Sequence, residues 1–393
     1  MVNSLRKRLL LCGTDLELEL TKKLADVPYI SSSSSLQSID KPSTSTDQYI
    51  ILANGVKMPM LGLGTTHSGG YYHDSVLHAL RHSGYRMIDT ARRYGVETEL
   101  GIAIRDCGVP REELFVSTKL WPTDYGNGVS QAFTSQCKKL QVDYLDAYLL
   151  HFPDVPEWLG KAKSVREETW RQMELLYDAG KCRSIGVSNF DVVDLEEMDE
   201  YASILPHVNQ SEYHPLYNPT DLRAYCTEKN ILFTGYCPLG KGRALLLKPI
   251  QSIARRLNRT PAQICLRWSI ENGIPVIPKS KDIERIDENA QVRFSFRTMN
   301  SSLRYYIFHI LQNINIKRLR QIVTLPLQIF DFSLSPEDHE EISKLHCSSN
   351  KLLSKDDLSK KWNLPDGYKL NGRVFGVPYD SESSIIPREA KRC

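Results

Sequence analysis

The chain has 393 residues, 41% of them apolar, so it is long enough to bury one large core. Its 50 basic and 47 acidic residues give a formal net charge of +3, a balance that argues against nucleic acid or a membrane surface as the main partner. Nine cysteines are scattered without the spacing of a metal site or a disulfide framework, which favours a reducing, cytoplasmic setting and no bound metal.

The first 48 residues are polar and of low complexity, with a run of serines from Ser31 to Ser35. Such a composition has too little apolar content to offset the cost of ordering the chain, so we predict a disordered Ser/Thr-rich leader over 1–48. Ordered structure is expected from about Tyr49, where 50–56 suggests two short strands around an Asn-Gly turn.

From Met58 onward, short apolar runs alternate with helical patterns, and this rhythm predicts the fold. Eight βα repeats are typical of an α/β protein with a (β/α)8 barrel, here a single domain over 49–291. The rival, an open doubly wound sheet, lacks support because no run is followed by a GxGxxG phosphate turn. The eight runs are 60–64, 87–91, 114–120, 144–151, 184–189, 207–213, 231–239 and 274–280.

Three local signals predict the helices between these runs. Val76, Ala79 and Leu80 would form one apolar helix face. Ser164 and Glu167 have the spacing of a capping box at a helix start. Thr260 followed by Pro261 predicts an N-cap with proline at the first helical position.

Residues 292–328 break the pattern and are interpreted as an atypical basic and apolar insertion. They contain six basic residues and no acidic one, among many aromatic and aliphatic side chains. Loops of this length are uncommon in compact domains. Two origins stay open: a translated intron or alternative exon, or a basic amphipathic segment that contacts a membrane surface or partner. Residues 329–393 would then be the segment that closes the barrel and a C-terminal tail.

Four polar residues lie at or just after the ends of predicted strands. Asp89, Lys119 and His151 end successive apolar runs, and Tyr94 follows Asp89 by five positions. Active sites of (β/α)8 barrels are built at the carboxyl ends of strands, so these side chains should meet there. Carbonyl reduction by hydride needs a proton donor, and Tyr94 could serve if the Lys119 ammonium lowers its pKa. Asp89 would hold Lys119, and His151 would orient the substrate oxygen.

Around these residues the chain resembles the aldo-keto reductase family. The most specific stretch is 84–101, which includes Asp89, Tyr94 and Glu97. The resemblance runs from about residue 49 to 291 and resumes at 329–335. Other matching stretches are 117–121, 143–151, 186–190, 209–215, 235–240 and 277–280, with Arg285, Glu288 and Asn289.

The resemblance implies an NADPH-dependent oxidoreductase, similar to alcohol dehydrogenase (NADP+), that reduces small aldehydes or ketones to alcohols. It implies Tyr94 as the general acid, assisted by Asp89, Lys119 and His151. Histidine rather than glutamate at position 151 favours reduction of carbonyls over conjugated double bonds. A monomer is also expected.

The resemblance further implies where an extended dinucleotide would bind across the barrel mouth. Ser188, Asn189 and Gln210 would bind the carboxamide of the nicotinamide, and the Tyr236 ring would stack on it. Leu239 is a further cofactor-binding position. Lys279, Ser280 and Arg285 suit a 2′-phosphate, which favours NADPH over NADH, and Glu288 and Asn289 match adenine-side positions.

The substrate pocket is less well specified. Trp121 and Phe152, with Trp158 as a further candidate, are expected to line it, although aromatic residues at a barrel mouth also serve in plain packing. Thr66, Val96 and Phe152 depart from residues common in the family. We expect a wide-mouthed pocket for generic aldehydes.

Two alternatives to an active reductase stay open. The chain could be a cofactor-binding but non-catalytic or regulatory relative, against which the intact set of four polar residues argues. It could also be an isoform impaired by the 292–328 insertion, because Val292 follows Asn289 by only three positions.

Overall fold

The computed structural model describes residues 48–65, 70–290, 331–352, 369–370 and 373–374. Apart from Gln48, the predicted leader lies outside these residues, as do the 292–328 insertion and most of the tail. Those three assignments therefore stay predictions. Among the described helices, none is long and apolar enough to cross a membrane.

Seven parallel strands form the wall of the barrel, and each pairs with the next along the chain. Every residue of the five central strands is buried, as expected for a parallel sheet covered by helices. The strands are β3 (Leu63–Gly64), β4 (Met87–Asp89), β5 (Phe115–Leu120), β6 (Ala147–Leu150), β7 (Ile185–Ser188), β8 (Val208–Glu212) and β9 (Leu232–Tyr236).

The eighth predicted strand is present only as a short segment that closes the barrel. Val276 makes parallel bridges to Leu61 on one side and to Gly235 on the other. Pro275 and Pro278 flank it and have no N–H to donate, so a regular ladder cannot extend over 274–280. The carbonyl groups of Pro275 and Pro278 still accept hydrogen bonds from the amides of Gly235 and Gly64, on the two neighbouring strands. Because this segment closes the ring of strands, the (β/α)8 barrel predicted from the sequence is confirmed.

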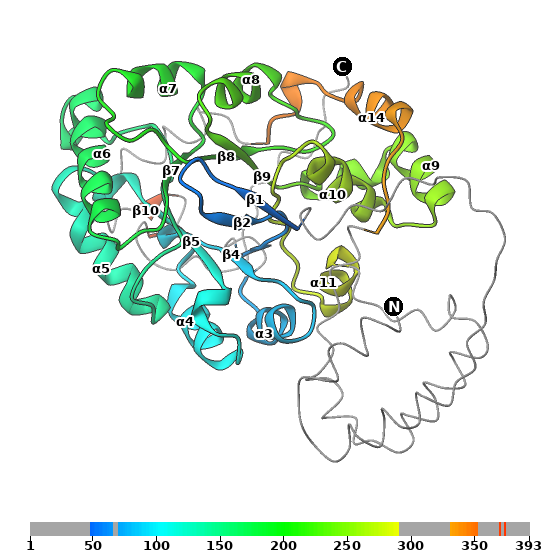
Figure 1. Cartoon of the computed structure of the whole chain (residues 1–393), viewed down its shortest axis with the longest axis horizontal. Coiled ribbons are helices and arrows are strands. Elements are labelled where there is room, and N and C mark those ends of the chain that lie inside the picture. Colours follow the sequence, from blue (N-terminus) through cyan, green and yellow to red (C-terminus); the bar gives the residue numbers. More distant parts are fainter. Residues whose placement is uncertain (1–47, 66–69, 291–330, 353–368, 371–372, 375–393) are drawn as a thin grey trace, which may run out of the picture. The chain divides into compact units, whose positions relative to one another are not determined.

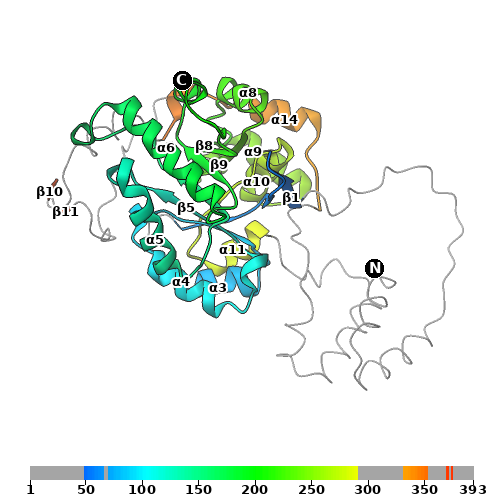
Figure 2. The ribbon, with the colours of Figure 1, turned by 60° about the vertical axis from the view of Figure 1, so that its left-hand side comes forward.

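Helices surround the strands, as Figure 1 shows from one end and Figure 2 after a 60° turn. They are α3 (His73–Arg81), α4 (Glu97–Asp106), α5 (Val129–Leu140), α6 (Ala162–Asp178), α7 (Val192–Asp199), α8 (Thr220–Glu228), α9 (Lys248–Leu257), α10 (Pro261–Glu271), α11 (Ile283–Ala290) and α14 (Pro336–Ser343). Two further short strands, β10 (Lys369–Leu370) and β11 (Arg373–Val374), pair antiparallel.

Two of the three helix signals are confirmed. Val76, Ala79 and Leu80 are the buried face of α3, and Thr260 caps α10 in a capping box with Gln263. The Ser164–Glu167 capping box is wrong, because α6 already starts at Ala162 after Lys161. The chain turns at Gly160, whose φ of 120° suits glycine, so the helix begins before Ser164.

A β-hairpin closes the amino end of the barrel. The strands β1 (Tyr49–Ile51) and β2 (Lys57–Pro59) pair antiparallel around the predicted Asn-Gly turn, and the second strand lies just beyond the predicted range 50–56. Leu52 and Met58 pack in one cluster with Met87 and Phe115, the first residues of β4 and β5. The opposite, carboxyl end of the strands is therefore where side chains can meet a ligand.

Residues 331–352 pack against the barrel. The Leu334 amide and the His339 ring both bind the carboxylate of Glu271 at the end of α10. Further along, the Leu352 amide donates to Glu212 Oε1 at 2.6 Å, at the end of β8. This C-terminal segment thus reaches the same end of the barrel as the polar residues predicted from the sequence.

Candidate active site

A buried ion pair lies at the carboxyl ends of β4 and β5. Lys119 Nζ is 2.5 Å from Asp89 Oδ1, and their side chains are 1% and 3% exposed. Lys119 Nζ also donates to the Thr90 carbonyl at 3.0 Å, and Gln210 Nε2 donates to the second Asp89 oxygen at 2.9 Å. Each oxygen of this carboxylate therefore has a donor, which is the condition for keeping a charge in the interior.

Tyr94 and His151 lie next to this ion pair. Tyr94 ends the short 3-10 turn η2 (Arg92–Tyr94), and Lys119 Nζ lies 5.5 Å from the centroid of its ring. The rings of Tyr94 and His151 meet edge to face, with their centroids 5.7 Å apart. The structure thus brings together all four polar residues that the sequence placed at strand ends.

The environment keeps Tyr94 protonated. Burial raises the pKa of Tyr94 well above its usual value, and Asp89 and Cys237 raise it further. This shift of the pKa is opposite to the one expected from Lys119, because burial of the phenol, with Asp89 beside it, decides the direction. Burial also lowers the pKa of Lys119, while the Asp89 carboxylate opposes that change. At neutral pH Tyr94 is therefore a neutral phenol that can donate a proton.

Glu97 belongs to the stretch 84–101 that most resembles the family, and the sequence did not indicate its role. In the structure it connects α4 to β5, the strand that carries Lys119. Its side chain is buried, and Oε1 accepts from Thr118 Oγ1 at 2.9 Å and from Gln136 Nε2 at 2.8 Å. The same Gln136 nitrogen lies 3.2 Å from the Lys119 carbonyl, and Tyr148 donates to Gln136 Oε1. This hydrogen-bond network holds the backbone of β5 in place at Thr118 and Lys119.

Three of the predicted cofactor-binding residues, Ser188, Asn189 and Tyr236, form one hydrogen-bonded group at the ends of β7 and β9. Ser188 and Gln210 are buried, and Asn189 takes a positive φ of 64° that turns the chain after β7. Asn189 Nδ2 donates to the His151 carbonyl at 2.9 Å and to Ser188 Oγ at 3.1 Å. Tyr236 donates its hydroxyl to Asn189 Oδ1 at 2.7 Å, which fixes the direction of its ring.

The predicted phosphate-side residues lie around the start of α11. Lys279 is half-buried and donates to the Gly70 carbonyl at 3.0 Å, and both burial and Lys281 lower its pKa. Ser280 Oγ bonds the backbone of Asp282, and Arg285 is exposed. Spacings of three and four residues place Glu288 and Asn289 on the helix face of Arg285, toward the end of α11. Leu239 packs at the edge of the core, beyond β9.

Two of the three predicted pocket aromatics surround His151. The Trp121 ring meets the His151 ring edge to face at 5.4 Å, and the Phe152 ring stacks on His151 at 4.7 Å. Trp121 and Phe152 also contact each other at 5.9 Å. The third, Trp158, is 48% exposed, so it does not line an enclosed pocket.

Sequence reasoning missed features at the rim. Arg93 lies over the Trp121 ring, and Tyr125 donates its hydroxyl to the Phe152 carbonyl at 2.5 Å. The sequence feature that could have indicated these contacts is the pair of arginines directly before Tyr94.

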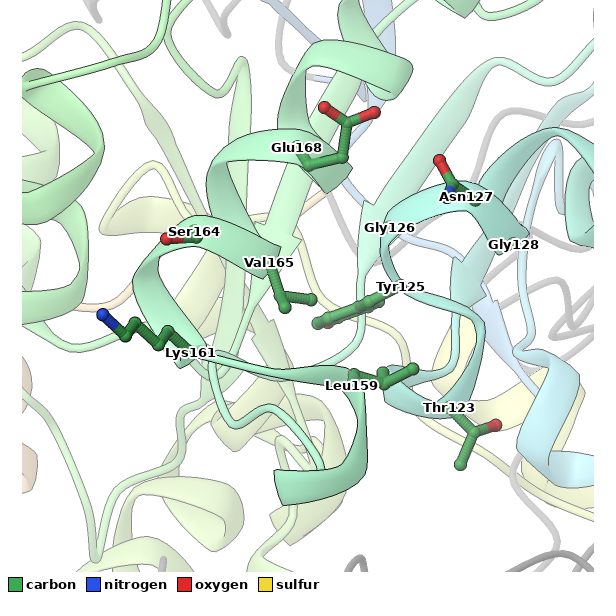
Figure 3. A pocket seen from close by; sticks show the side chains of 10 residues that line it. All are labelled: Thr123, Tyr125, Gly126, Asn127, Gly128, Leu159, Lys161, Ser164, Val165 and Glu168. Carbon is green, nitrogen blue, oxygen red and sulfur yellow. The ribbon is translucent and has the colours of Figure 1, made fainter.

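Next to these contacts lies a hollow of about 630 Å³ (Figure 3), lined by the loop from Thr123 to Gly128 and the start of α6 with Lys161 and Glu168. It contains none of the four predicted catalytic residues.

Metal ligands were not expected, and the described part of the chain holds no group of three or more His, Cys, Asp or Glu side chains arranged to bind a metal. Burial raises the pKa of Cys237, the thiol that also acts on the pKa of Tyr94, to about 12. At neutral pH this thiol is protonated, so it has little nucleophilic character.

Several known proteins are similar to this chain in sequence and fold. An uncharacterized oxidoreductase of Caenorhabditis elegans is 48% identical over 343 residues, which cover 87% of this chain and 95% of that protein. The glyoxal reductase of Bacillus subtilis is 43% identical over 252 residues, 63% of this chain and 88% of its own length. The crystal structure of a Bombyx mori aldo-keto reductase in complex with NADP is 28% identical, with a TM-score of 0.65, and covers 79% of this chain and 96% of that one.

A sequence model of one family matches most of the barrel. The match covers residues 60–305 and therefore includes the predicted catalytic and cofactor-binding residues. Together with the barrel and the similar proteins, it shows that this chain belongs to the aldo/keto reductase family, whose chemistry is the oxidation and reduction of carbonyl groups.

Proposed function

We propose that this protein reduces aldehydes or ketones to alcohols with NADPH. The observation that carries the proposal is the buried Asp89–Lys119 pair directly beside the edge-to-face rings of Tyr94 and His151. A neutral phenol and an imidazole that converge next to a buried ion pair can bind and protonate one oxygen atom.

Each residue of the site has a role in that reaction. His151 hydrogen-bonds the carbonyl oxygen and orients it, and Tyr94 donates its proton to that oxygen as negative charge develops. Asp89 and Lys119 fix the electrostatic surroundings of the phenol, while Trp121 and Phe152 cover His151 and exclude water. NADPH, when bound, supplies the hydride to the carbonyl carbon.

The chemistry of the predicted cofactor residues fits NADPH. Gln210 donates its amide nitrogen to Asp89, so its oxygen is the atom that would accept from a carboxamide. Tyr236 presents an aromatic ring anchored by Asn189, which suits stacking on nicotinamide. Lys279 and Arg285 bring two cationic side chains to the start of α11, which suits a 2′-phosphate. The NADP complex of the Bombyx mori relative supports the same cofactor.

Cofactor choice provides a sharp test of the phosphate-side residues. Lys279→Met and Arg285→Gln should each raise the KM for NADPH by about tenfold or more, since each removes charge-assisted bonds to phosphate. The KM for NADH, which lacks that phosphate, should change much less. Steady-state oxidation of both cofactors with one aromatic aldehyde measures the difference.

The control for this test is Lys344→Gln, which removes an exposed lysine paired with Glu340 on α14. It should leave both KM values at their wild-type level. Equal losses for NADPH and NADH in the Lys279 and Arg285 variants would show that these residues do not recognise the 2′-phosphate.

The name of the Bacillus subtilis relative, a glyoxal reductase, supports a small carbonyl compound as substrate. A panel of aldehydes and ketones with NADPH and NADH side by side would also separate an active reductase from a non-catalytic, cofactor-binding relative. Cytoplasmic location and a monomeric state stay predictions.

A further inference from the structure

Three hydrogen bonds hold the backbone of His151 and Phe152, the first two residues after β6. The His151 amide donates to the Leu120 carbonyl at 3.1 Å, and the His151 carbonyl accepts from Asn189 Nδ2 at 2.9 Å. The Phe152 carbonyl accepts from the Tyr125 hydroxyl at 2.5 Å. Both neighbouring strand ends and the loop after β5 therefore contribute to fixing the residue whose imidazole would orient the substrate oxygen.

Tyr125, the donor from the loop, is itself held in place. Its side chain is 2% exposed, and the amide of the next residue, Gly126, donates to Thr169 Oγ1 of α6 at 2.8 Å. Leu159 and Val165 lie beside the Tyr125 ring in Figure 3, and both pack against the apolar core to which this ring belongs. The loop and the ring are thus anchored to α6, so the hydroxyl can fix the position of another residue.

The Phe152 ring carries that position to His151. The two rings stack with their centroids 4.7 Å apart and an angle of 15° between their planes. Trp121 meets both rings edge to face, at 5.4 Å from His151 and 5.9 Å from Phe152. Contacts between aromatic rings depend on their orientation, so a shift of Phe152 would also move the imidazole. A displacement of about 1 Å at a group that orients a substrate can cost about 100-fold in rate.

We propose that Tyr125 is a positioning residue for carbonyl reduction. Its hydrogen bond sets the place of the stacked Phe152 ring and, through that ring, the orientation of the His151 imidazole. This inference rests on the proposed function and adds a residue to the same site. Tyr125 lies between the stretches 117–121 and 143–151 that resemble the family, which is why the sequence did not indicate it.

Tyr125→Phe removes only the hydroxyl and tests this role. With the full chain, NADPH and an aromatic aldehyde, kcat should fall by about five- to tenfold, since the loss of one buried hydrogen bond has an effect of this size. The Kd for NADPH, measured by protein fluorescence, should match that of the wild type, because the cofactor residues are untouched. A partly unfolded variant would lose activity and cofactor binding together, so the difference between the two readouts identifies positioning.

The matched control is Tyr177→Phe. It removes from α6 a hydroxyl that accepts from Asn54 Nδ2 at 3.3 Å, in the hairpin at the amino end of the barrel. Its kcat and its Kd for NADPH should both match those of the wild type.

A double-variant cycle tests whether the effect passes through the Phe152 ring. Phe152→Leu keeps the backbone carbonyl that accepts from Tyr125 but removes the ring stacked on His151. If the ring carries the effect, Tyr125→Phe should lower kcat little further in the Phe152→Leu protein. Independent residues would instead give losses that multiply, and that result would overturn the proposal.

The wild-type protein separates failure of this inference from failure of the proposed function. If it reduces the aldehyde and Tyr125→Phe has the same kcat, Tyr125 does not position the site and carbonyl reduction stands. A parallel loss of NADPH binding in Tyr125→Phe, or an equal loss of kcat in Tyr177→Phe, would overturn the inference in the same way. If the wild-type protein reduces none of a panel of aldehydes, the proposed function is wrong and this inference falls with it.

Discussion

Replacing Tyr94 by phenylalanine should lower kcat for aldehyde reduction by about 10²- to 10⁴-fold, the usual contribution of a general acid. The change removes only the hydroxyl, so the ring can keep its edge-to-face contact with His151 and its place beside Lys119. The pKa of Tyr94 is raised by burial, so at neutral pH the wild-type residue has a proton to give. Initial rates of NADPH oxidation with an aromatic aldehyde measure the loss.

Two controls show whether that loss belongs to proton donation. The affinity of Tyr94→Phe for NADPH, measured by protein fluorescence, should match that of the wild type, because Tyr94 is not among the residues proposed to hold the cofactor. Tyr225→Phe, which removes from the outer helix α8 a hydroxyl that donates to Asp199 of α7, should leave kcat unchanged. If Tyr94→Phe oxidised NADPH at the wild-type rate, Tyr94 would not be the acid.

Breaking the Asp89–Lys119 pair should cost both stability and activity. In Lys119→Met the Asp89 carboxylate stays buried without its cation, which should lower the free energy of unfolding by about 3–5 kcal/mol. In Asp89→Asn the cost should be smaller, because burial already lowers the pKa of Lys119 and the amine can lose its proton. Urea unfolding and NADPH oxidation measure the two effects.

The double variant Asp89→Asn/Lys119→Met separates stability from catalysis. Two uncharged side chains of similar size should restore most of the lost stability, since no charge is left buried. The turnover number should stay as low as in the single variants, because the electrostatic surroundings of Tyr94 are gone. Recovery of activity together with stability would show that the pair serves only the fold.

The positions of Asp89, Lys119 and His151 were predictable because two simple patterns coincide. Parallel strands are buried on both faces, so they appear in the sequence as apolar runs, and a polar residue at the end of such a run stands out. A closed barrel brings the ends of all its strands to one rim. Spacing along the chain was therefore enough to place these three side chains together.

Other features depend on the surroundings of a residue and could not be read from spacing. The pKa direction of Tyr94 was expected from one neighbour, Lys119, but burial and Asp89 decide it in the folded protein. The role of Glu97 requires knowing that Thr118 and Gln136, from β5 and α5, converge on its carboxylate.

Backbone chemistry and loop geometry explain the remaining differences. Pro275 and Pro278 shorten the eighth strand to bridges at Val276, although the apolar run around them is longer. The early start of α6 depends on the turn at Gly160, which outweighed the capping spacing of Ser164. The Arg93–Trp121 contact joins two loops whose conformations no local pattern specifies.

The most direct test of carbonyl reduction follows the hydride itself. The full chain is incubated with an aromatic aldehyde and NADPH that carries deuterium at both C4 positions of the nicotinamide, and the alcohol is analysed by mass spectrometry and NMR. Direct transfer predicts an alcohol with one deuterium on its carbinol carbon, formed in equal amount to the NADPH consumed. Absence of the alcohol, or an alcohol without deuterium at that carbon, would contradict the proposed reaction.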